Sequence, residues 1–195
     1  MSIRPFSLDD MDRLVDICID TWITPSEYGD RLLREMSEYY ILGVWAESEA
    51  CIVYSIEEEP VGFIFIGRRP CTPDEGLLER RGSLSSVLMD DPDGRRLVGD
   101  ISFFDREHDI LFSRFDGPEW ELKLIMVGRE HRMMGIGRSL IEHAACMLDV
   151  HEMLLYTDDD CDCAFYDRFD HCIMATNRFE LDGRSGCSYA YVIRM

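Results

Sequence analysis

The sequence predicts a mixed α/β fold, and three segments carry that prediction. Residues 121–148 form an apolar strand, a glycine loop and a helix, because apolar residues are nearly continuous before Gly128 and helically spaced after Gly137. Residues 50–66 contain two β-rich runs joined by an acidic turn, which is the pattern of an antiparallel hairpin. Residues 7–22 place apolar side chains at helical spacing behind a Ser-x-x-Asp capping box. We therefore expect a sheet flanked by helices.

Composition indicates one domain over residues 1–195. The chain is 46% hydrophobic, and its length suffices to bury a core without disulfides or metals. Its formal net charge of −19 favours solubility and cationic partners and disfavours nucleic acid. No signal segment or membrane span is apparent, and several of the eight cysteines lie in apolar patterns. We expect a cytoplasmic protein with reduced cysteines and no membrane partner; the sequence leaves a homodimer open.

Shorter patterns predict the elements at the two ends of the chain. Residues 3–6 predict a strand, and Pro25 ends the first helix before a second helical pattern over residues 28–40. Residues 172–179 and 187–194 predict two closing strands, the second with alternating apolar side chains. These strands would extend the sheet of the central hairpin.

Residues 68–118 interrupt the β pattern with helical signals. Thr72, followed by a proline and two acids, predicts an N-cap, and a second helix is predicted after Gly94. The apolar stripe of that second helix continues to Phe115 once His108 is skipped. We expect His108 to be a satisfied histidine at the core boundary, and the segment to be either extra core or the wall of a substrate pocket.

The loop between residues 128 and 138 has the properties of an anion site. Glycines at the start of a helix leave backbone N–H groups free, and the helix dipole favours negative charge there. Arg129, His131, Arg132 and Arg138 concentrate positive charge in an otherwise acidic chain. The loop lacks both the Gly-x-Gly-x-x-Gly and the Gly-Lys-Ser/Thr pattern, which disfavours dinucleotide and P-loop folds. A tight turn that packs the helix against the strand is the simpler alternative.

The motif Arg132-x-x-Gly135-x-Gly137 after an apolar strand resembles the acyl-CoA pyrophosphate loop of the GNAT superfamily of N-acetyltransferases. Residues 154–157, an acidic turn and the Phe165-Tyr166 pair are similar to that family's next strand and helix. The resemblance covers residues 119–171 and implies a mixed, mostly antiparallel sheet of six to seven strands flanked by helices. Residues 68–118 would then be a helical insertion before the CoA-binding strand.

The resemblance also implies an activity, which is transfer of an acetyl group from acetyl-CoA to a primary amine by direct attack in a ternary complex. The acceptor would be a small-molecule or peptide amine, and the acidic composition favours a cationic one. No metal is implied. The residues implied in binding the cosubstrate are Ile125, Met126 and Val127 along the strand and Arg132, Met133, Met134, Gly135, Ile136, Gly137 and Arg138 in the loop.

Two residues are implied in catalysis. Tyr166 would protonate the departing thiolate, and Glu121 lies eleven residues before Arg132, where the histone-acetylating branch places its glutamate base. Glu121 could instead form a surface ion pair with Lys123, and Asp158 or water could act as the base. Tyr166 could be a packing residue.

The sequence also departs from the family pattern. Asp170-His171 replace the common Gly-Phe, and Asp159, which could still cap a helix, stands where an asparagine is common. The cysteine-rich acidic run over residues 158–163 fits neither a calcium loop nor a zinc site. Two other functional classes remain open: a non-catalytic CoA-binding or regulatory module, and an acidic protein–protein adaptor.

Overall fold

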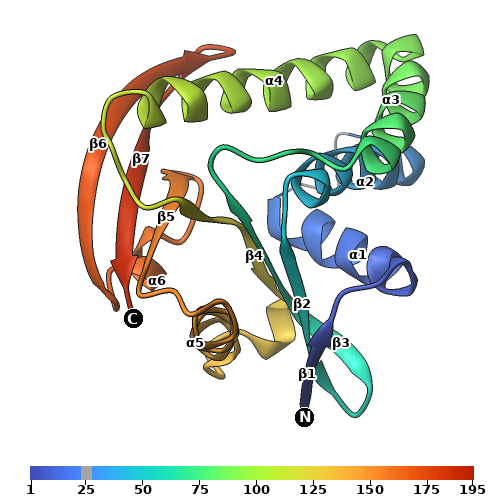
Figure 1. The fold of residues 1–195 in the computed structure, drawn as a ribbon. Helices are drawn as coiled ribbons and strands as arrows, with labels where there is room; N and C mark the ends of the chain where they lie inside the picture. The colour runs from blue at the N-terminus through green and yellow to red at the C-terminus, as the bar shows by residue number, and fades with distance from the viewer. Residues whose placement is uncertain (23–27) are drawn as a thin grey trace.

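A computed structural model describes residues 1–22 and 28–195, which fold around a seven-stranded sheet (Figure 1). The strand order is β1-β2-β3-β4-β5-β7-β6, and every neighbouring pair is antiparallel except β4 and β5. This architecture confirms the predicted mixed, mostly antiparallel fold. The strands are β1 (Ser2–Pro5), β2 (Ala50–Ile56), β3 (Glu59–Arg68), β4 (Trp120–Val127), β5 (Glu152–Asp158), β6 (Asp170–Leu181) and β7 (Arg184–Arg194).

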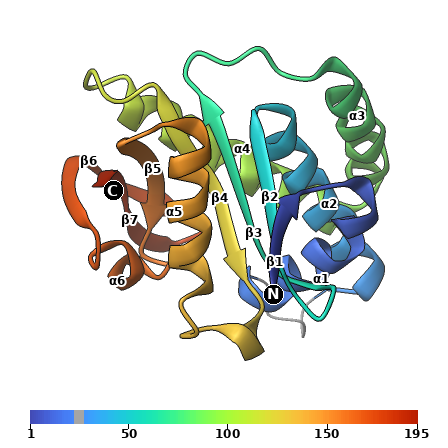
Figure 2. The ribbon, with the colours of Figure 1, turned by 60° about the horizontal axis from the view of Figure 1, so that its bottom comes forward.

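Helices cover both faces of the sheet. Helix α5 lies in front of the sheet in Figure 2, and α1 and α2 lie behind it. No helix in the described ranges is long and apolar enough to cross a membrane. The helices are α1 (Met11–Trp22), α2 (Asp30–Ala46), α3 (Glu75–Asp90), α4 (Pro92–Phe112), α5 (Ile136–Leu148) and α6 (Cys163–Tyr166), with 3-10 turns at Leu8–Asp10 and Arg129–His131.

Strand β3 separates two apolar cores and is buried on both faces. Ile64 and Ile66 pack toward α5, whereas Phe63 and Phe65 pack toward α1 and α2. All four side chains are fully buried. A strand covered on both faces has a continuous apolar sequence instead of an alternating one, as β3 does.

The predicted capping box is present before α1 and is closed by an ion pair. The Asp10 carboxylate accepts hydrogen bonds from the Ser7 backbone N–H at 2.9 Å and from Arg4 at 2.8 and 2.5 Å. Its side chain is buried, and burial alone would raise its pKa. The Arg4 and Ser7 hydrogen bonds outweigh burial and hold the pKa of Asp10 below its ordinary value.

We expect Asp10→Ala to lower the free energy of unfolding by about 1–3 kcal/mol at neutral pH, because Arg4 and the Ser7 N–H lose their acceptor. Since the folded pKa is depressed, this stabilisation is complete above the unfolded pKa of about 3.9 and is lost as pH falls through the folded pKa. Urea unfolding at pH 7 and at progressively lower pH measures the difference. Asp9→Ala is the matched control, because Asp9 is exposed in the same turn. An equal effect of both variants would contradict the assignment.

The inserted segment forms two helices, α3 and α4, as predicted, but α3 begins later than expected and α4 begins at Pro92, before the predicted start after Gly94. Asp74 is the N-cap, accepting from the Leu77 N–H at 2.9 Å, in place of Thr72. The Asp74 N–H also donates to the Ala46 carbonyl at 2.8 Å, and this tertiary bond to the end of α2 selects the cap. Helix α4 spans from α2 and α3 to β6 and β7 (Figure 1) and ends before Phe115.

The closing hairpin is longer than the sequence indicated, and all eight cysteines are free. Asp159 does not cap a helix. It accepts from the Cys187 N–H at 2.7 Å and from the Tyr189 hydroxyl at 2.8 Å, which fixes the turn after β5 to β7. The predicted helix break at Pro25 lies outside the described residues.

Candidate active site

Strands β4 and β5 meet at one end and separate toward the other. Their parallel pairing is limited to Glu121 with Leu154 and Leu122 with Leu155. Strand β4 continues to Val127 without β5 beside it. The sheet therefore contains a split that is closed at Glu121 and open toward the loop after β4.

The backbone of β4 alternates between β3 and this split. Gly128 donates to the Val61 carbonyl at 2.8 Å, and alternate residues of an antiparallel strand bond to the same neighbour. Met126 therefore faces β3 with its backbone, and Ile125 and Val127 face the split. An extended ligand in the split would find these two residues as hydrogen-bonding partners.

A β-bulge at Lys123 marks the closed end of the split. Phe65 pairs with Leu124 and Ile66 with Leu122, so Lys123 is the extra residue of β4. The bulge sends Leu122 into the α5 core and Leu124 into the opposite core. It also leaves Glu121 and Lys123 in contact, at 3.4 Å between Oε2 and Nζ.

The open end of the split leads into a loop whose backbone donors are free. Met133 and Gly135 have φ angles of +63° and +79°, and α5 begins directly after them. The first backbone N–H to bond inside the helix belongs to Ser139, at 3.0 Å from the Gly135 carbonyl. Among the described residues, the N–H groups of residues 133–138 have no hydrogen-bond acceptor. Such a nest at a helix N-terminus suits an anion.

Side-chain contacts hold this loop in place and leave the space next to Gly135 open. Arg132 donates to the Val127 carbonyl at 3.1 Å and to the Thr21 hydroxyl at 2.9 Å. A Cβ at Gly137 would lie 3.1 Å from the Phe165 ring, so α5 and α6 pack closely there. A Cβ at Gly135 would meet no atom within 4 Å, which leaves room for a bound group. The loop thus combines free backbone donors with the open space that an anion requires.

Glu121 is buried at the closed end of the split and is surrounded by basic side chains. Its Oε1 lies 2.7 Å from His108 Nε2, and its Oε2 lies 3.4 Å from Lys123 Nζ and 3.7 Å from Arg69 Nε. Burial alone would raise the pKa of Glu121, but His108, Lys123 and Arg69 outweigh burial and lower it. The surface ion pair of Glu121 and Lys123, which the sequence offered as an alternative, is instead part of a buried cluster.

The pKa values of His108 and Lys123, the two main partners of Glu121, are raised. Burial alone would lower the pKa of His108, but the carboxylate of Glu121 raises it. Burial alone would also lower the pKa of Lys123, but Glu121 and Glu47 raise it. Glu47 Oε2 lies 3.1 Å from Lys123 Nζ. A Cβ at Gly67 would clash with the Glu47 backbone carbonyl and with the Lys123 side chain, so glycine there leaves room for both. The cluster therefore places a buried carboxylate against three basic side chains.

Tyr166 lies on the other face of the sheet. It ends the one-turn helix α6 and packs against the α5 core, with its ring centroid 5.1 Å from Phe165 and 6.2 Å from Tyr191. Burial and the nearby Cys161 raise the pKa of Tyr166, so its hydroxyl keeps its proton at neutral pH. Asp158 is occupied locally, because its side chain accepts from the Asp160 N–H at 3.0 Å.

A comparison with known protein families assigns the chain to a family. The model of the acetyltransferase (GNAT) family matches residues 13–170. The chain belongs to the GNAT acetyltransferase family. Members of this family transfer acetyl groups and use acetyl-CoA.

Solved structures share the GNAT fold of this chain at low sequence identity. The protein smu.2055 from Streptococcus mutans UA159 superposes with a TM-score of 0.58 and 15% identity, covering 100% of this chain and 99% of that one. A ribosomal-protein-alanine N-acetyltransferase from Brucella melitensis gives 0.57 and 16%, covering 100% of both chains. The ribosomal-protein-S18-alanine N-acetyltransferase from Escherichia coli gives 0.57 and 12%, covering 99% and 92%. A search of curated proteins found no match.

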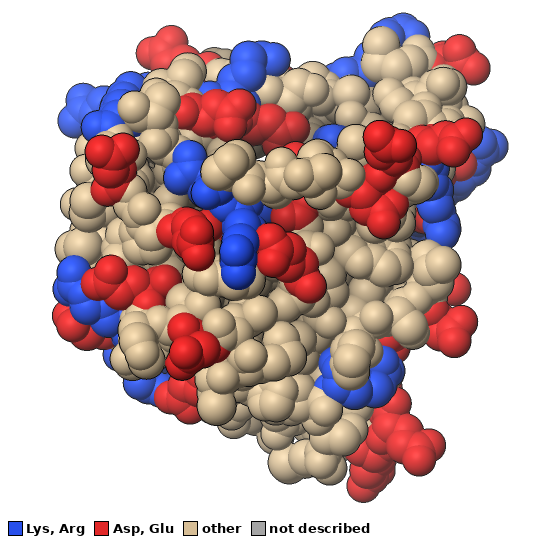
Figure 3. All heavy atoms as spheres, viewed as in Figure 1, with Lys and Arg blue, Asp and Glu red and all other residues tan. Residues whose placement is uncertain are grey.

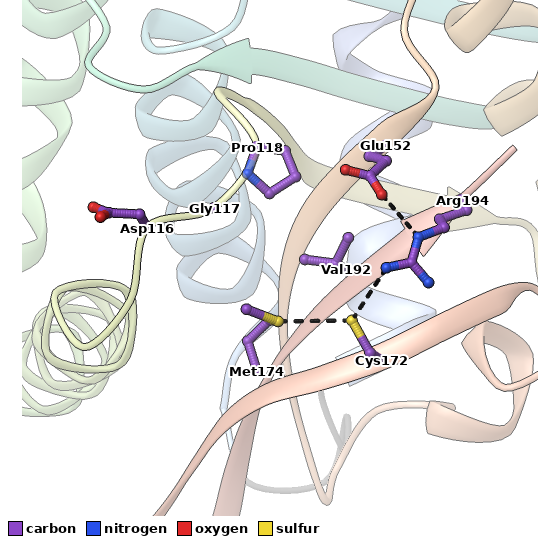
Figure 4. A pocket seen from close by; sticks show the side chains of 8 residues that line it. All are labelled: Asp116, Gly117, Pro118, Glu152, Cys172, Met174, Val192 and Arg194. Carbon is purple, nitrogen blue, oxygen red and sulfur yellow. Dashed lines mark hydrogen bonds and ion pairs between the residues drawn. The ribbon is translucent and has the colours of Figure 1, made fainter.

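Two surface hollows of this GNAT chain lie away from the split. One, of about 370 Å³, lies where Arg194 contacts Glu152 and Cys172 (Figure 4). The other, of about 500 Å³, is lined by the β6–β7 hairpin and Asp159. Neither contains a residue that the sequence implied in catalysis or CoA binding. Within the described ranges, no three His, Cys, Asp or Glu side chains gather as a metal site.

Sequence reasoning missed the contact between His108 and Glu121. The two residues belong to different elements, α4 and β4, and the insertion brings them together. The available signal was a histidine placed on the apolar stripe of a helix, which requires a buried partner.

Proposed function

We propose that this GNAT protein transfers an acetyl group from acetyl-CoA to a primary amine by direct attack in a ternary complex. The observation that carries this proposal is the continuity of the β4–β5 split with the loop of free N–H groups. The extended acyl-bearing arm of acetyl-CoA and the diphosphate that follows it require these two features in that order.

The chain itself would bind and orient the cosubstrate. The backbone groups of Ile125 and Val127 would bond to the pantetheine arm as a neighbouring strand does. The N–H groups of residues 133–138 and the helix dipole of α5 would bind the pyrophosphate. Acetyl-CoA supplies the thioester carbonyl that the amine attacks, and the closed end of the split sets the position of that carbonyl near Glu121.

The reaction then needs two proton transfers. A C–N bond forms between the amine and the acetyl carbon, the C–S bond breaks, and the sulfur leaves with the bonding electrons. Tyr166 would donate a hydrogen bond or its proton to the departing sulfur. Glu121 would serve removal of the amine proton, which leaves neutral amide and thiol as products.

The acceptor is proposed only as a class. Two of the similar structures are named as enzymes acting on an alanine of ribosomal proteins, which is compatible with a peptide amine here. The net charge of −19 favours a cationic small-molecule or peptide amine. On the face shown in Figure 3, however, acidic and basic side chains are interspersed, so this face has no single-sign field.

A binding measurement and an activity screen together test the proposal. Calorimetry measures CoA binding, and released thiol is followed with acetyl-CoA against a panel of polyamines, aminoglycosides and peptide N-termini. Binding with amine-dependent thiol release supports the transferase. Binding without release for any amine would leave a non-catalytic CoA-binding module, and absence of binding would overturn the site itself.

CoA binding is expected to weaken roughly three- to tenfold between low salt and about 0.5 M salt, because charged groups in the exposed loop are screened beyond the Debye length. Calorimetric titrations across this range measure the change. Pantetheine, which lacks the phosphates, is the matched ligand and should show little salt dependence. Equal salt dependence of both ligands would place the charged contacts outside the loop.

A further inference from the structure

We propose that His108, on the inserted helix α4, accepts the proton of the acceptor amine and that Glu121 acts by positioning it. This inference deepens the proposed acetyl transfer and rests on it. It assigns a catalytic role to the insertion, which the sequence left as extra core or pocket wall.

The imidazole of His108 spans the closed end of the split. Its Nε2 lies 2.7 Å from Glu121 on β4, and its ring centroid lies 5.8 Å from that of Tyr156 on β5. Phe112, one turn further along α4, packs against the imidazole with 4.2 Å between the ring centroids. The ring is therefore held at the one place where the two strands meet, next to the end of any arm that enters from the loop.

Glu121 is poorly suited to take the proton itself. Its side chain is 4% exposed, and its two oxygens are already engaged by His108, Lys123 and Arg69. The His108 side chain is 24% exposed, so within the His108–Glu121 pair it is the member that an incoming amine can reach. The basic partners also lower the pKa of Glu121, which makes it a weaker base, whereas Glu121 raises the pKa of His108, which makes it a stronger one.

The hydrogen bond to Glu121 fixes the form in which His108 would act. In the neutral ring, Nε2–H donates to Glu121 Oε1, so Nδ1, which lies 3.3 Å from Asp109 Oδ1, is the nitrogen that carries no proton. Nδ1 would accept the proton that the attacking amine loses, giving an imidazolium that Glu121 stabilises. Asp109, whose side chain is 83% exposed, has its Oδ1 3.3 Å from Nδ1 and provides the exit for that proton to solvent.

The base and the acid would lie on opposite faces of the sheet. His108 packs with Phe112 over the face that carries Leu154, whereas Tyr166 packs against the α5 core. Attack from one face and departure of sulfur toward the other fit this separation. The titratable and charged side chains that face the imidazole are Glu121 and Lys123 of β4, Asp105 and Asp109 of α4, and Tyr156 of β5.

The first test is His108→Gln, because its amide can still donate to Glu121 but cannot accept a proton at neutral pH. We expect kcat to fall about tenfold to a hundredfold with KM for acetyl-CoA unchanged, and the acidic limb of the pH–rate profile to disappear. His143→Gln, an exposed histidine on α5, is the matched control. Calorimetric CoA binding and thermal unfolding verify that each variant is folded.

The second test is Glu121→Gln, which separates positioning from proton transfer. Without the carboxylate the imidazolium is less stabilised, so the acidic limb should move to lower pH while remaining present. Loss of the limb in Glu121→Gln, with the limb intact in His108→Gln, would make Glu121 the base and overturn the inference. A His108→Gln variant with the parent's rate and profile would also overturn it. If the parent protein releases no thiol with any amine, the proposed acetyl transfer fails first.

Discussion

Gly135→Glu is expected to weaken CoA binding roughly hundredfold or more. Gly135 has φ +79° in the middle of the free N–H groups, and the space in front of its Cα is open. A glutamate there puts a carboxylate where the pyrophosphate would bind, and opposed like charges cost several kcal/mol. Since each 1.4 kcal/mol is tenfold in affinity, this cost is enough for the predicted loss.

Two control variants separate the charge from the backbone. Gly183→Glu introduces the same residue at φ +77°, also with open space around it, but in the β6–β7 turn. It should lose similar stability, since a left-handed residue with a side chain costs about 1–2 kcal/mol, yet it should bind CoA like the parent. Gly135→Ala has the strain without the charge and should bind with intermediate affinity.

The result that would reject the loop as the phosphate site is simple to recognise. A folded Gly135→Glu protein with the parent's dissociation constant for CoA in calorimetry would do so. Equal weakening by Gly135→Glu and Gly183→Glu would assign the effect to general destabilisation. In either case the split between β4 and β5 would need another explanation.

The strand–loop–helix unit could be predicted from sequence because its signals are local. A nearly continuous apolar run, paired glycines and a helical apolar stripe specify β4, the turn and α5 without reference to the rest of the chain. Residues implied in CoA binding are close in sequence, so one correct local prediction brings them together. The capping box at Ser7 and Asp10 was predicted correctly for the same reason, because its signal is also local.

Features set by tertiary contacts could not be predicted. The choice of Asp74 over Thr72 as N-cap depends on a hydrogen bond to Ala46, far away in the chain. The bulge at Lys123 depends on the register of β4 against β3, and the pattern of apolar and polar residues in β4 does not reveal it. The burial of Glu121 depends on α4, whose position over the sheet follows from packing against β6 and β7. Glu121, for which strand alternation allowed a surface position, is therefore buried.

Tyr166→Phe is expected to lower kcat about tenfold to a few hundredfold while leaving the fold and the affinity for acetyl-CoA nearly unchanged. The substitution removes only the hydroxyl, and the ring contacts with Phe165 and Tyr191 remain. Because burial raises the pKa of Tyr166, the phenol is protonated at neutral pH and can donate as charge develops on sulfur. Thiol release and calorimetry on the same preparation separate turnover from binding.

Tyr189→Phe is the matched control for this prediction, because it also removes only a hydroxyl, one that donates to Asp159, from a ring that packs on the same core. It should keep the parent's kcat. A Tyr166→Phe protein that acetylates a competent amine at the parent's rate would make Tyr166 a packing residue, with water serving the departing thiolate. A thioester whose thiol has a lower pKa distinguishes an acid role of Tyr166 from a packing role, because departure of that thiolate needs less help from an acid. The deficit of Tyr166→Phe should therefore shrink with such a thioester if the hydroxyl acts on the sulfur.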